Sequence, residues 1–600
     1  MAKKRFPLLQ FPSINLQHTL PLLLFWIAIG AVLRFAQLAG KPPWTDEFAT
    51  LVFSLGNDYQ NVPLDQIISP STLLQPLKMI PGVGVTDVFT NLITQDNHPP
   101  IYFILAHIWL EILPTGGEYV SVWIARSLPA LLGVISIPAI YFLSLVTFRS
   151  RLVAHFSALI LALSPYGIFL SQEARHYTLV TLFVIAGLTC LVAAIQRLSQ
   201  GQTLPWWLII TWLIVNSLGF ITHYFFTLTL LAQLLAILFL IWPKIKILPF
   251  SRFHNNLMTT PTHTLPPQWW RLLFVGFGTL IVSLAWVLIF IPENYGSGTT
   301  AWIKNDGFSF LSLINPPIQL FTTCLAMIYL LPVESSYLVA VIVSGLIMLF
   351  LLLFALPSLI LQLKSKPKSH NILIGKKLLI NFFMSAVIIF LSISYFFGID
   401  ITRGARYSFV YFPSLIVLFA ASLAPWWKSQ DIIPQPLGSF LLKKVGIKKL
   451  QVKGKRAVQI ILLSIFLSSL TVIANLGYQK YYRPDLLVSL LQKNSNLPIL
   501  IATTHISLVQ TGEMMGIAWE LKQKPSSQPV NFLLAHQDEP ESPIATKTLQ
   551  QETQNLPRPF ELWTVNFHAP QELTNCVRKK QKLPHIDGYE YEVHQCKPLT

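Results

Sequence analysis

Long apolar runs, separated by short polar segments, follow one another along most of the chain. Most of these runs are close to, or longer than, the 20 residues with which an α-helix crosses a bilayer. They lie at 18–40, 121–147, 153–170, 176–196, 205–221, 225–242, 272–292, 337–363, 378–397, 409–425 and 457–476. The pattern predicts an all-α polytopic membrane protein with about eleven transmembrane helices.

A further apolar stretch, "PPIYFILAHIWLEILP" at 99–114, is short, begins with two prolines and contains Glu111. If it does not span and the N-terminus is inside, the cytoplasmic loops hold 23 lysines and arginines against one acid, Asp431. The positive-inside rule favours this arrangement, so we expect 99–114 to be a helix along the outer interface. The cytoplasmic loops are then 1–17, 148–152, 197–204, 243–271, 364–377 and 426–456.

Two larger polar regions then lie on the outer side. The first loop, 41–120, has eight acids and two bases, and the tail, 477–600, has twelve of each. We expect a membrane domain over 1–476, with interfacial helices in its first outer loop, and a small extracytoplasmic α/β domain over 477–600. Three apolar runs in the tail predict buried strands. They are "LPILIATT" (497–504), "VNFLLA" (530–535) and "FELWTVNF" (560–567).

Composition supports a membrane location and argues against nucleic acid as a partner. Hydrophobic residues make up 53% of the chain, charged residues 12%, and the mean hydropathy is +0.55. Soluble proteins carry about twice as much charge. The net charge of +17 comes from bases in the short loops between spans. The start, "MAKKRFPLLQ", resembles a signal peptide, but the apolar run that follows is long and lacks a small-x-small cleavage site, so we expect it to remain as the first span.

The four cysteines fall into two groups. Cys190 and Cys324 lie in apolar surroundings, where a thiol packs as a small inert group. Cys576 and Cys596 lie in the polar tail. If that tail is extracytoplasmic, its compartment is oxidising, and we expect these two cysteines to form a disulfide.

Polar residues suited to catalysis gather in five segments on the predicted outer side. Each segment is anchored by rigid helices, so the side chains would converge on one face of the membrane. Alone, each residue has an ordinary explanation, such as a solvated helix end or, for Arg34 and Arg126, a snorkelling arginine near the outer end of a span. Together they favour an enzyme site. The segments carry Asp46 and Glu47; Asp96 and His98; Glu173 and Arg175; His223; and Arg403, Arg406 and Tyr407.

The order and spacing of several motifs resemble a known family. The motifs are "WTDEFAT", "DNHPPIYF", "IARSLPALLGVISIPAIYFLS" and "LSPYGIFLSQEARHYTLVTLF". They resemble the GT-C membrane glycosyltransferases, and most of all the bacterial relatives of dolichyl-phosphate-mannose-protein mannosyltransferases in glycosyltransferase family 39. The resemblance covers about 18–240 and extends more weakly to 476, through "GARYSFVYFPSLIVLFAASLA". It does not cover the tail.

The resemblance implies a polyprenyl-phosphate-linked sugar as donor and transfer, with inversion, to a protein, lipid or glycan acceptor on the outer side of a bacterial plasma membrane. It implies that Asp46 and Glu47 correspond to the family's acidic motif in the first outer loop. Glu173 corresponds to a second acidic position, in a loop that varies among relatives.

The chemistry of such a transfer assigns roles to the candidates. The reaction passes through an oxocarbenium-like state and releases a phosphate, which needs positive charge more than a general acid. Arg403 and Arg406, and then Arg126 and Arg175, are the candidates to bind it. The acceptor hydroxyl needs one base, which we assign to Asp46. The remaining candidates orient the base, bind the acceptor or shape the site, and a divalent metal at Glu173 stays open. They are Glu47, Glu173, Asp96, His98, His223 and Tyr407.

Other classes of protein remain open on the sequence. A transporter would show ionisable residues in mid-span, broken helices or paired repeats, and no repeat is visible. A lipid-handling protein, such as a polyprenyl-phosphate hydrolase, could use the same arginines and carboxylates without an acceptor. A non-catalytic scaffold would tolerate the loss of Asp46.

The charge asymmetry generates a first prediction. Cysteines introduced one at a time into 41–120 and the tail should react with a membrane-impermeant thiol reagent on intact cells. A cysteine in 426–456 should react only after permeabilisation, because this segment lies inside. Labelling of 426–456 from outside would contradict the orientation.

Overall fold

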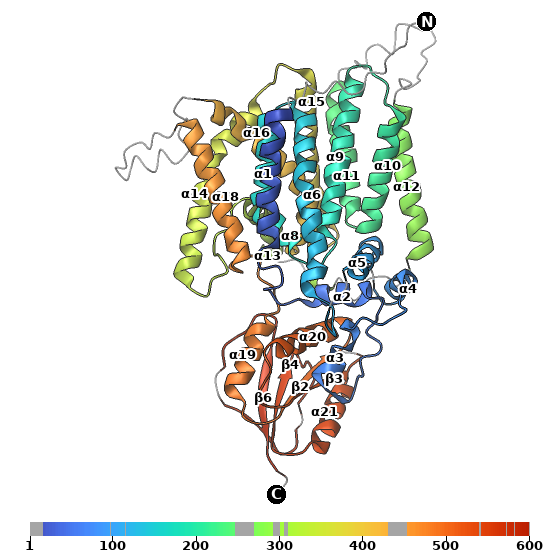
Figure 1. Cartoon of the computed structure of the whole chain (residues 1–600), viewed down its shortest axis with the longest axis vertical. Helices are drawn as coiled ribbons and strands as arrows, with labels where there is room; N and C mark the ends of the chain where they lie inside the picture. The colour runs from blue at the N-terminus through green and yellow to red at the C-terminus, as the bar shows by residue number, and fades with distance from the viewer. Residues whose placement is uncertain are drawn as a thin grey trace, which may run out of the picture.

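The chain forms a helical bundle with a smaller, sheet-containing domain at one end (Figure 1). It is described here from a computed structural model. The described residues are 16–96, 98–113, 116–245, 269–291, 301–304, 310–429, 453–538, 542–571, 573–580 and 583–598. Most of the basic segments 1–17, 243–271 and 426–456 lie outside them.

The bundle contains helices long and apolar enough to cross a membrane, so the chain is an integral membrane protein. Among the described residues six helices meet this condition, or seven if α7 and α8, bent by 56°, form one span. All eleven predicted runs contain helix, but their number as spans stays a prediction. The bundle helices are α1 (Leu16–Phe35), α6 (Val122–Phe148), α7 (Arg151–Leu163), α8 (Pro165–Ser171), α9 (Tyr177–Ser199), α10 (Trp206–Thr222), α11 (Phe226–Ile245), α12 (Trp270–Phe290), α13 (Phe310–Ala326), α14 (Leu338–Lys364), α15 (His370–Phe396), α16 (Phe412–Lys428) and α18 (Gly454–Ile473).

The break between α7 and α8 is filled by Arg34. At the end of α7 the regular helical hydrogen-bond pattern is interrupted, so the last carbonyl groups can accept from a side chain. Arg34, 1% exposed, donates to the carbonyl oxygens of Leu161 and Ala162 at 2.9 and 3.1 Å. The residue therefore stabilises a broken helix inside the bundle instead of snorkelling to the surface.

The first loop forms a layer of short helices beneath the bundle (Figure 1). Among them, α5 has 12 residues, which at about 1.5 Å per residue cannot cross a hydrocarbon core of about 30 Å. It packs against α2, α4 and α6. The elements are α2 (Thr45–Ser54), β1 (Ile67–Ile68), α3 (Pro70–Leu73), η1 (Gln75–Leu77), α4 (Val85–Gln95) and α5 (Ile101–Ile112).

The tail forms an α/β domain around a mixed sheet, with strand order β1-β3-β2-β4-β6-β5. Strands β2, β3 and β4 coincide with the three predicted runs, which confirms them, and β2 pairs in parallel with both neighbours. The sequence did not predict β1, β5 or β6, which pair antiparallel. The tail elements are α19 (Pro484–Asn494), β2 (Ile499–His505), α20 (Leu508–Gln523), β3 (Val530–His536), α21 (Ile544–Asn555), β4 (Phe560–Val565), β5 (Cys576–Arg578) and β6 (Tyr591–Cys596).

The first loop and the tail share one hydrophobic core. Strand β1 of the loop pairs with β3 of the tail, with Ile67 opposite Leu533. Phe48 of α2 belongs to the same buried cluster as Met514 of α20, and its ring lies 6.4 Å from that of Trp519. Helix α2 is thereby held between the bundle and the tail domain.

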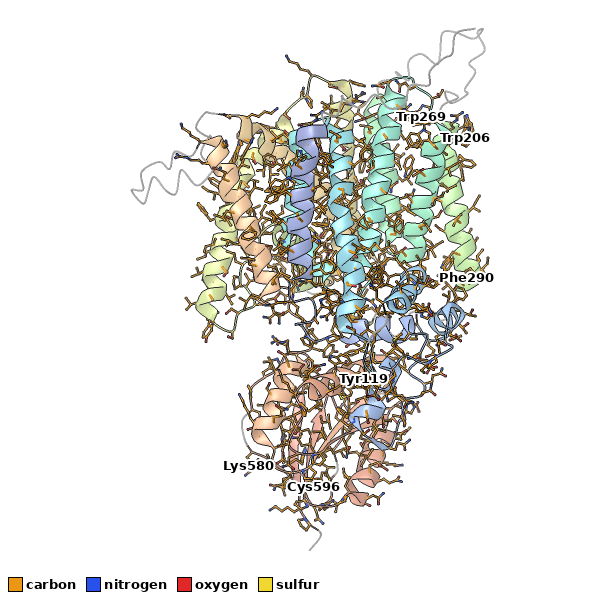
Figure 2. The ribbon with its side chains drawn as sticks, in the orientation of Figure 1. Tyr119, Trp206, Trp269, Phe290, Lys580 and Cys596 are labelled. Carbon is orange, nitrogen blue, oxygen red and sulfur yellow. A yellow bond between two sulfur atoms is a disulfide. The ribbon has the colours of Figure 1, made fainter. Side chains whose placement is uncertain are left out.

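The two ends of the bundle differ in their side chains. Trp206 and Trp269 lie at the end far from the tail domain, and Phe290 lies at the near end (Figure 2). At the far end the guanidinium of Arg271 lies 5.0 Å from the Trp206 ring and 5.4 Å from the Trp270 ring. Aromatic and basic residues of this kind are typical of a membrane–water interface.

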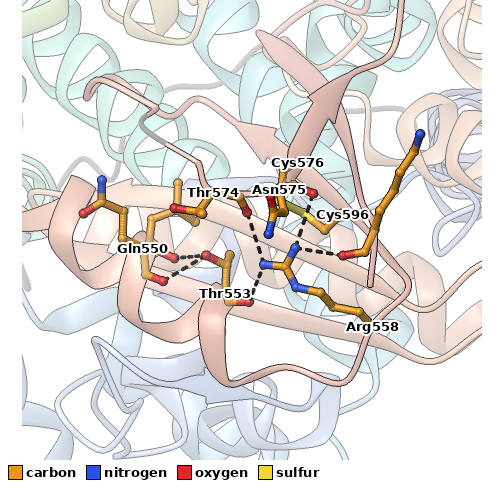
Figure 3. Close-up of a disulfide and its surroundings, with 9 residues drawn as sticks. Gln550, Thr553, Arg558, Thr574, Asn575, Cys576 and Cys596 are labelled. Atoms are coloured by element: carbon orange, nitrogen blue, oxygen red, sulfur yellow. Dashed lines mark hydrogen bonds between the residues drawn. A yellow bond between two sulfur atoms is a disulfide. The ribbon is translucent and has the colours of Figure 1, made fainter. Parts of the chain in front are cut away.

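A disulfide between Cys576 and Cys596 joins β5 to β6, which confirms the predicted pair. Arg558 donates to the carbonyl oxygens of Thr574, Asn575 and Lys597 beside it (Figure 3). The covalent bond and this arginine together fix the last edge of the sheet.

Removing the disulfide should destabilise the tail domain. Closing a loop of this length contributes about 3 kcal/mol, so Cys576→Ser with Cys596→Ser should lower the free energy of unfolding by about that amount. Denaturant unfolding of the purified protein, followed by tail tryptophan fluorescence, measures it. Reductant should shift the wild-type midpoint and leave the double variant unchanged; equal midpoints for both proteins would contradict the prediction.

Candidate active site

The two acids in the first turn of α2 have opposite environments. Asp46 and Glu47 lie where negative charge suits the N-terminus of a helix. Neighbouring residues on a helix point about 100° apart, so one carboxylate can face the core while the other faces the site. The Asp46 side chain is 29% exposed, and Glu47 is 1% exposed.

Glu47 is bound from two directions. Arg126 of α6 donates to both of its carboxylate oxygens at 2.8 Å, and the Ala174 N–H donates to Oε1 at 2.7 Å. Burial would raise the pKa of Glu47, but the Arg126 guanidinium outweighs it and holds this pKa below its ordinary value. Glu47 is therefore an anchored carboxylate inside the protein.

Arg126 is also committed to the protein. Its Nη1 donates to the carbonyl oxygens of Leu38 and Lys41 at 3.0 and 2.8 Å, and the residue is fully buried. Together with the two bonds to Glu47, these contacts use four of the five N–H groups of Arg126. The sequence suggested Arg126 as a phosphate-binding residue. In the structure its contacts join the end of the first span, α2 and α6.

Asp46 faces two other arginines. Its Oδ2 lies 3.7 Å from Arg175 Nη2 and 3.5 Å from Arg406 Nη2. Arg175 also donates to the Asp46 carbonyl oxygen at 2.9 Å and to Thr50 Oγ1 at 2.8 Å. The structure thus brings together residues from α2, from the turn before α9 and from the segment before α16.

A histidine links Arg175 to a third carboxylate. Arg175 Nη2 lies 2.9 Å from His98 Nε2, and His98 Nδ1 lies 3.0 Å from both carboxylate oxygens of Asp96. A guanidinium can only donate, so Nε2 accepts and the proton of a neutral ring is on Nδ1, which donates to Asp96. Asp96 and His98 therefore support the position of Arg175.

Arg406 lies in an aromatic cage. Its guanidinium is 4.7 Å from the ring centre of Trp44, 5.2 Å from that of Trp302 and 5.3 Å from that of Tyr407. It is carried by the 3-10 helix η5 (Ala405–Val410), which follows η4 (Ile401–Arg403); Trp302 belongs to η3 (Ala301–Ile303). Gly404 precedes η5, and a Cβ there would lie 2.6 Å from the Tyr407 ring, so a larger residue would displace this ring.

Arg403 occupies the rim. It is exposed, its Nε lies 3.6 Å from Asp400 Oδ2, and its Nη1 donates to the Trp302 carbonyl oxygen at 3.0 Å. Arg406, which is closer to Asp46 and less exposed, is the stronger candidate for a buried phosphate contact.

Two buried histidines line the site. The ring of His176 lies 5.5 Å from that of His98 and 4.5 Å from that of His223. Burial, reinforced by nearby positive groups, lowers the pKa of His176 and of His223 well below the ordinary value. The His223 ring is 6.2 Å from that of Tyr407. These rings are therefore neutral polar groups in an aromatic lining.

Glu173 is buried and in contact with Lys480. Lys480 was not among the residues that the sequence suggested for the site. Lys480 lies in "YQKYYRP", just after the last span, and its signal was its position as the first base of the tail. Trp44 and Trp302 were also missed as ring partners of Arg406. Among the described residues, no group of three His, Cys, Asp or Glu side chains could hold a metal ion.

Comparisons with known proteins give distant structural neighbours. No protein-family model matches the chain, and no curated protein matches its sequence. ArnT from Cupriavidus metallidurans bound to undecaprenyl phosphate is similar with a TM-score of 0.46 and 11% identity, over 95% of this chain and 97% of that chain. Archaeoglobus fulgidus oligosaccharyltransferase AglB in complex with an inhibitory peptide and a dolichol-phosphate is similar with a TM-score of 0.43 and 12% identity, over 91% and 69%.

The buried pair generates a stability prediction. Glu47→Gln or Arg126→Gln leaves the other charge buried without its partner, which should cost about 3–5 kcal/mol. The double variant leaves neither charge, so it should be less destabilised than the sum of the single variants. Thermal unfolding in detergent measures all three.

A matched control is Arg578→Gln, which breaks the exposed pair between Arg578 of β5 and Glu592 of β6 and should change the midpoint little. Additive single-variant effects at Glu47 and Arg126 would show that the two side chains do not act as a pair.

Proposed function

We propose that the chain is an integral-membrane glycosyltransferase of the GT-C type, which transfers a sugar from a polyprenyl-phosphate donor to an extracytoplasmic acceptor. The observation that carries the proposal is the placement of Asp46, a partly exposed carboxylate between Arg175 and Arg406 at the end of an apolar helical bundle. The motif resemblance supports the same reaction.

A lipid-linked donor fits this placement. Its hydrocarbon chain would lie in the bilayer beside the bundle, and its phosphate at the bundle end, where the arginines lie. The Nε of Arg406 is buried and has no hydrogen-bond partner among the described residues, and a phosphate oxygen bound there would satisfy this donor. An arginine in a partly dry site stabilises charge that develops on a leaving phosphate.

The base needs no long-range proton transfer. Asp46 accepts the proton of the acceptor hydroxyl. As it does so, the hydroxyl oxygen attacks the anomeric carbon of the sugar from the face opposite the phosphate. The bond from this carbon to the phosphate oxygen breaks, and the phosphate monoester leaves with the electron pair. One displacement inverts the anomeric configuration. Arg175 orients Asp46 by bonding its backbone oxygen.

The acceptor would arrive from the aqueous side. The loop 41–120 and the tail lie together at the same end of the bundle as Asp46 (Figure 1). The loop charges favour an outer location for that end and a cytoplasmic N-terminus, and the motif resemblance favours a bacterial plasma membrane. Protein, lipid and glycan acceptors all present a hydroxyl or similar nucleophile that this site could deprotonate.

The test is transfer from a panel of polyprenyl-phosphate sugars to mixed acceptors in detergent, with wild type beside Asp46→Asn. Asparagine keeps the size of the side chain but cannot take up the proton, so turnover should fall by about 10²–10⁴-fold. Donor affinity should change little, because the arginines hold the phosphate. Near-normal turnover in Asp46→Asn would remove the central residue of the mechanism.

Two further variants separate binding from chemistry. Arg406→Ala should weaken donor binding by about tenfold or more and also slow transfer, since it removes a charged contact to the phosphate. Asp58→Asn, in a turn of the same loop, is the matched control and should retain turnover. Loss of activity in the control as well would point to general damage of the loop.

A further inference from the structure

Residues 478–483, here called the strap, connect the last span to the tail domain and contact the turn before α9 that belongs to the candidate site. The Tyr478 ring stacks on that of Phe169 in α8 at 4.4 Å. The Gln479 N–H donates to Glu334 Oε2 at 2.7 Å. The Tyr482 hydroxyl donates to Glu513 Oε1 of α20 at 2.6 Å. The strap is therefore fixed to the bundle at one end and to the tail domain at the other.

Lys480 extends from the strap into the protein. Its side chain is 9% exposed and in contact with Glu173, whose side chain is 3% exposed. The ammonium also lies 5.0 Å from the Trp44 ring and 5.4 Å from the Phe169 ring. A buried ammonium and a buried carboxylate each need the other, because burying either charge alone is costly.

The turn that carries Glu173 is held at three consecutive residues. Glu173 contacts Lys480, the Ala174 N–H donates to Glu47, and Arg175 bonds the Asp46 carbonyl oxygen. The last two contacts come from α2. The first contact is the one that the strap supplies.

We infer that Lys480 is a positioning residue of this site, which holds Glu173 and thereby fixes the turn that aims Arg175 at Asp46. The inference rests on the proposed function, because it assigns Lys480 a role in that site. The inference also links the tail to the site, because the strap that leads to the tail carries Lys480 and so supplies one side chain of the site.

The charge of Lys480 is sensitive to pH near neutrality. Burial lowers its pKa to about 7, partly opposed by Glu47. Above this pH the neutral amine holds Glu173 less firmly, and the turn should loosen. The charged groups that face Lys480 are Glu173 from the turn, Glu47 and Asp46 from α2, Arg126 from α6, and Lys41 from the segment after α1.

The experiment is arginine labelling of the full-length protein in detergent with phenylglyoxal, read by peptide mass spectrometry. It needs no donor, so its outcome is independent of whether transfer is found. Arg175 is 1% exposed and should react slowly in wild type, whereas Arg403 on the rim serves as the reactive reference. Arg126, fully buried against Glu47, reports whether the structure around the turn has opened as well.

In Lys480→Met, labelling of Arg175 relative to Arg403 should rise about tenfold or more, because the loss of one partner from a buried charge pair is a large perturbation. Lys480→Arg keeps the charge and should stay within about twofold of wild type.

Between about pH 6 and pH 8.5, protection of Arg175 should fall in wild type but not in Lys480→Arg, which stays charged.

Equal protection of Arg175 in Lys480→Met and wild type would overturn the inference, as would Lys480→Arg that reacts like Lys480→Met. If Arg126 also reacts in Lys480→Met, the protein has opened generally, and the double variant with Glu173→Gln, which leaves no buried charge unpaired, replaces it. Reactive Arg175 with protected Arg126 in the double variant supports the inference; protection of both overturns it.

Discussion

The ion pair between Glu47 and Arg126 is the contact on which the arrangement of the site depends. Four segments meet there: the end of the first span through its carbonyl groups, α2 through Glu47, α6 through Arg126, and the turn before α9 through the Ala174 N–H. Buried charges tolerate few alternative geometries, because each unmet hydrogen bond is expensive where water is excluded. The pair therefore fixes the position of α2, and with it the direction of the neighbouring Asp46.

Around this fixed point the polar residues form layers of decreasing burial. Arg175 lies next to it, bound to Thr50 and supported by His98. Arg406 follows, caged by aromatic rings that limit its motion without using its donors. Arg403 lies outermost. A gradient of this kind holds the inner side chains rigid and leaves the outermost one exposed.

The sequence predicted the parts of this structure that depend on local pattern. Apolar runs identified the bundle helices other than α13, together with three tail strands, and cysteine placement identified the disulfide. It could not say which member of the Asp46–Glu47 pair is buried, because helix rotation decides that and the answer depends on Arg126 in another helix. Nor could it find Lys480, whose partner Glu173 lies far away in the chain.

The pairing of β1 with β3 has a consequence for how the protein is made. The loop that carries Asp46 leaves the ribosome early, but its strand partner lies near the end of the chain. Contacts so distant in sequence form late, because the chain between them must be ordered first. The layer that carries the candidate site thus stays incomplete until the last span is inserted and the tail has folded against the loop.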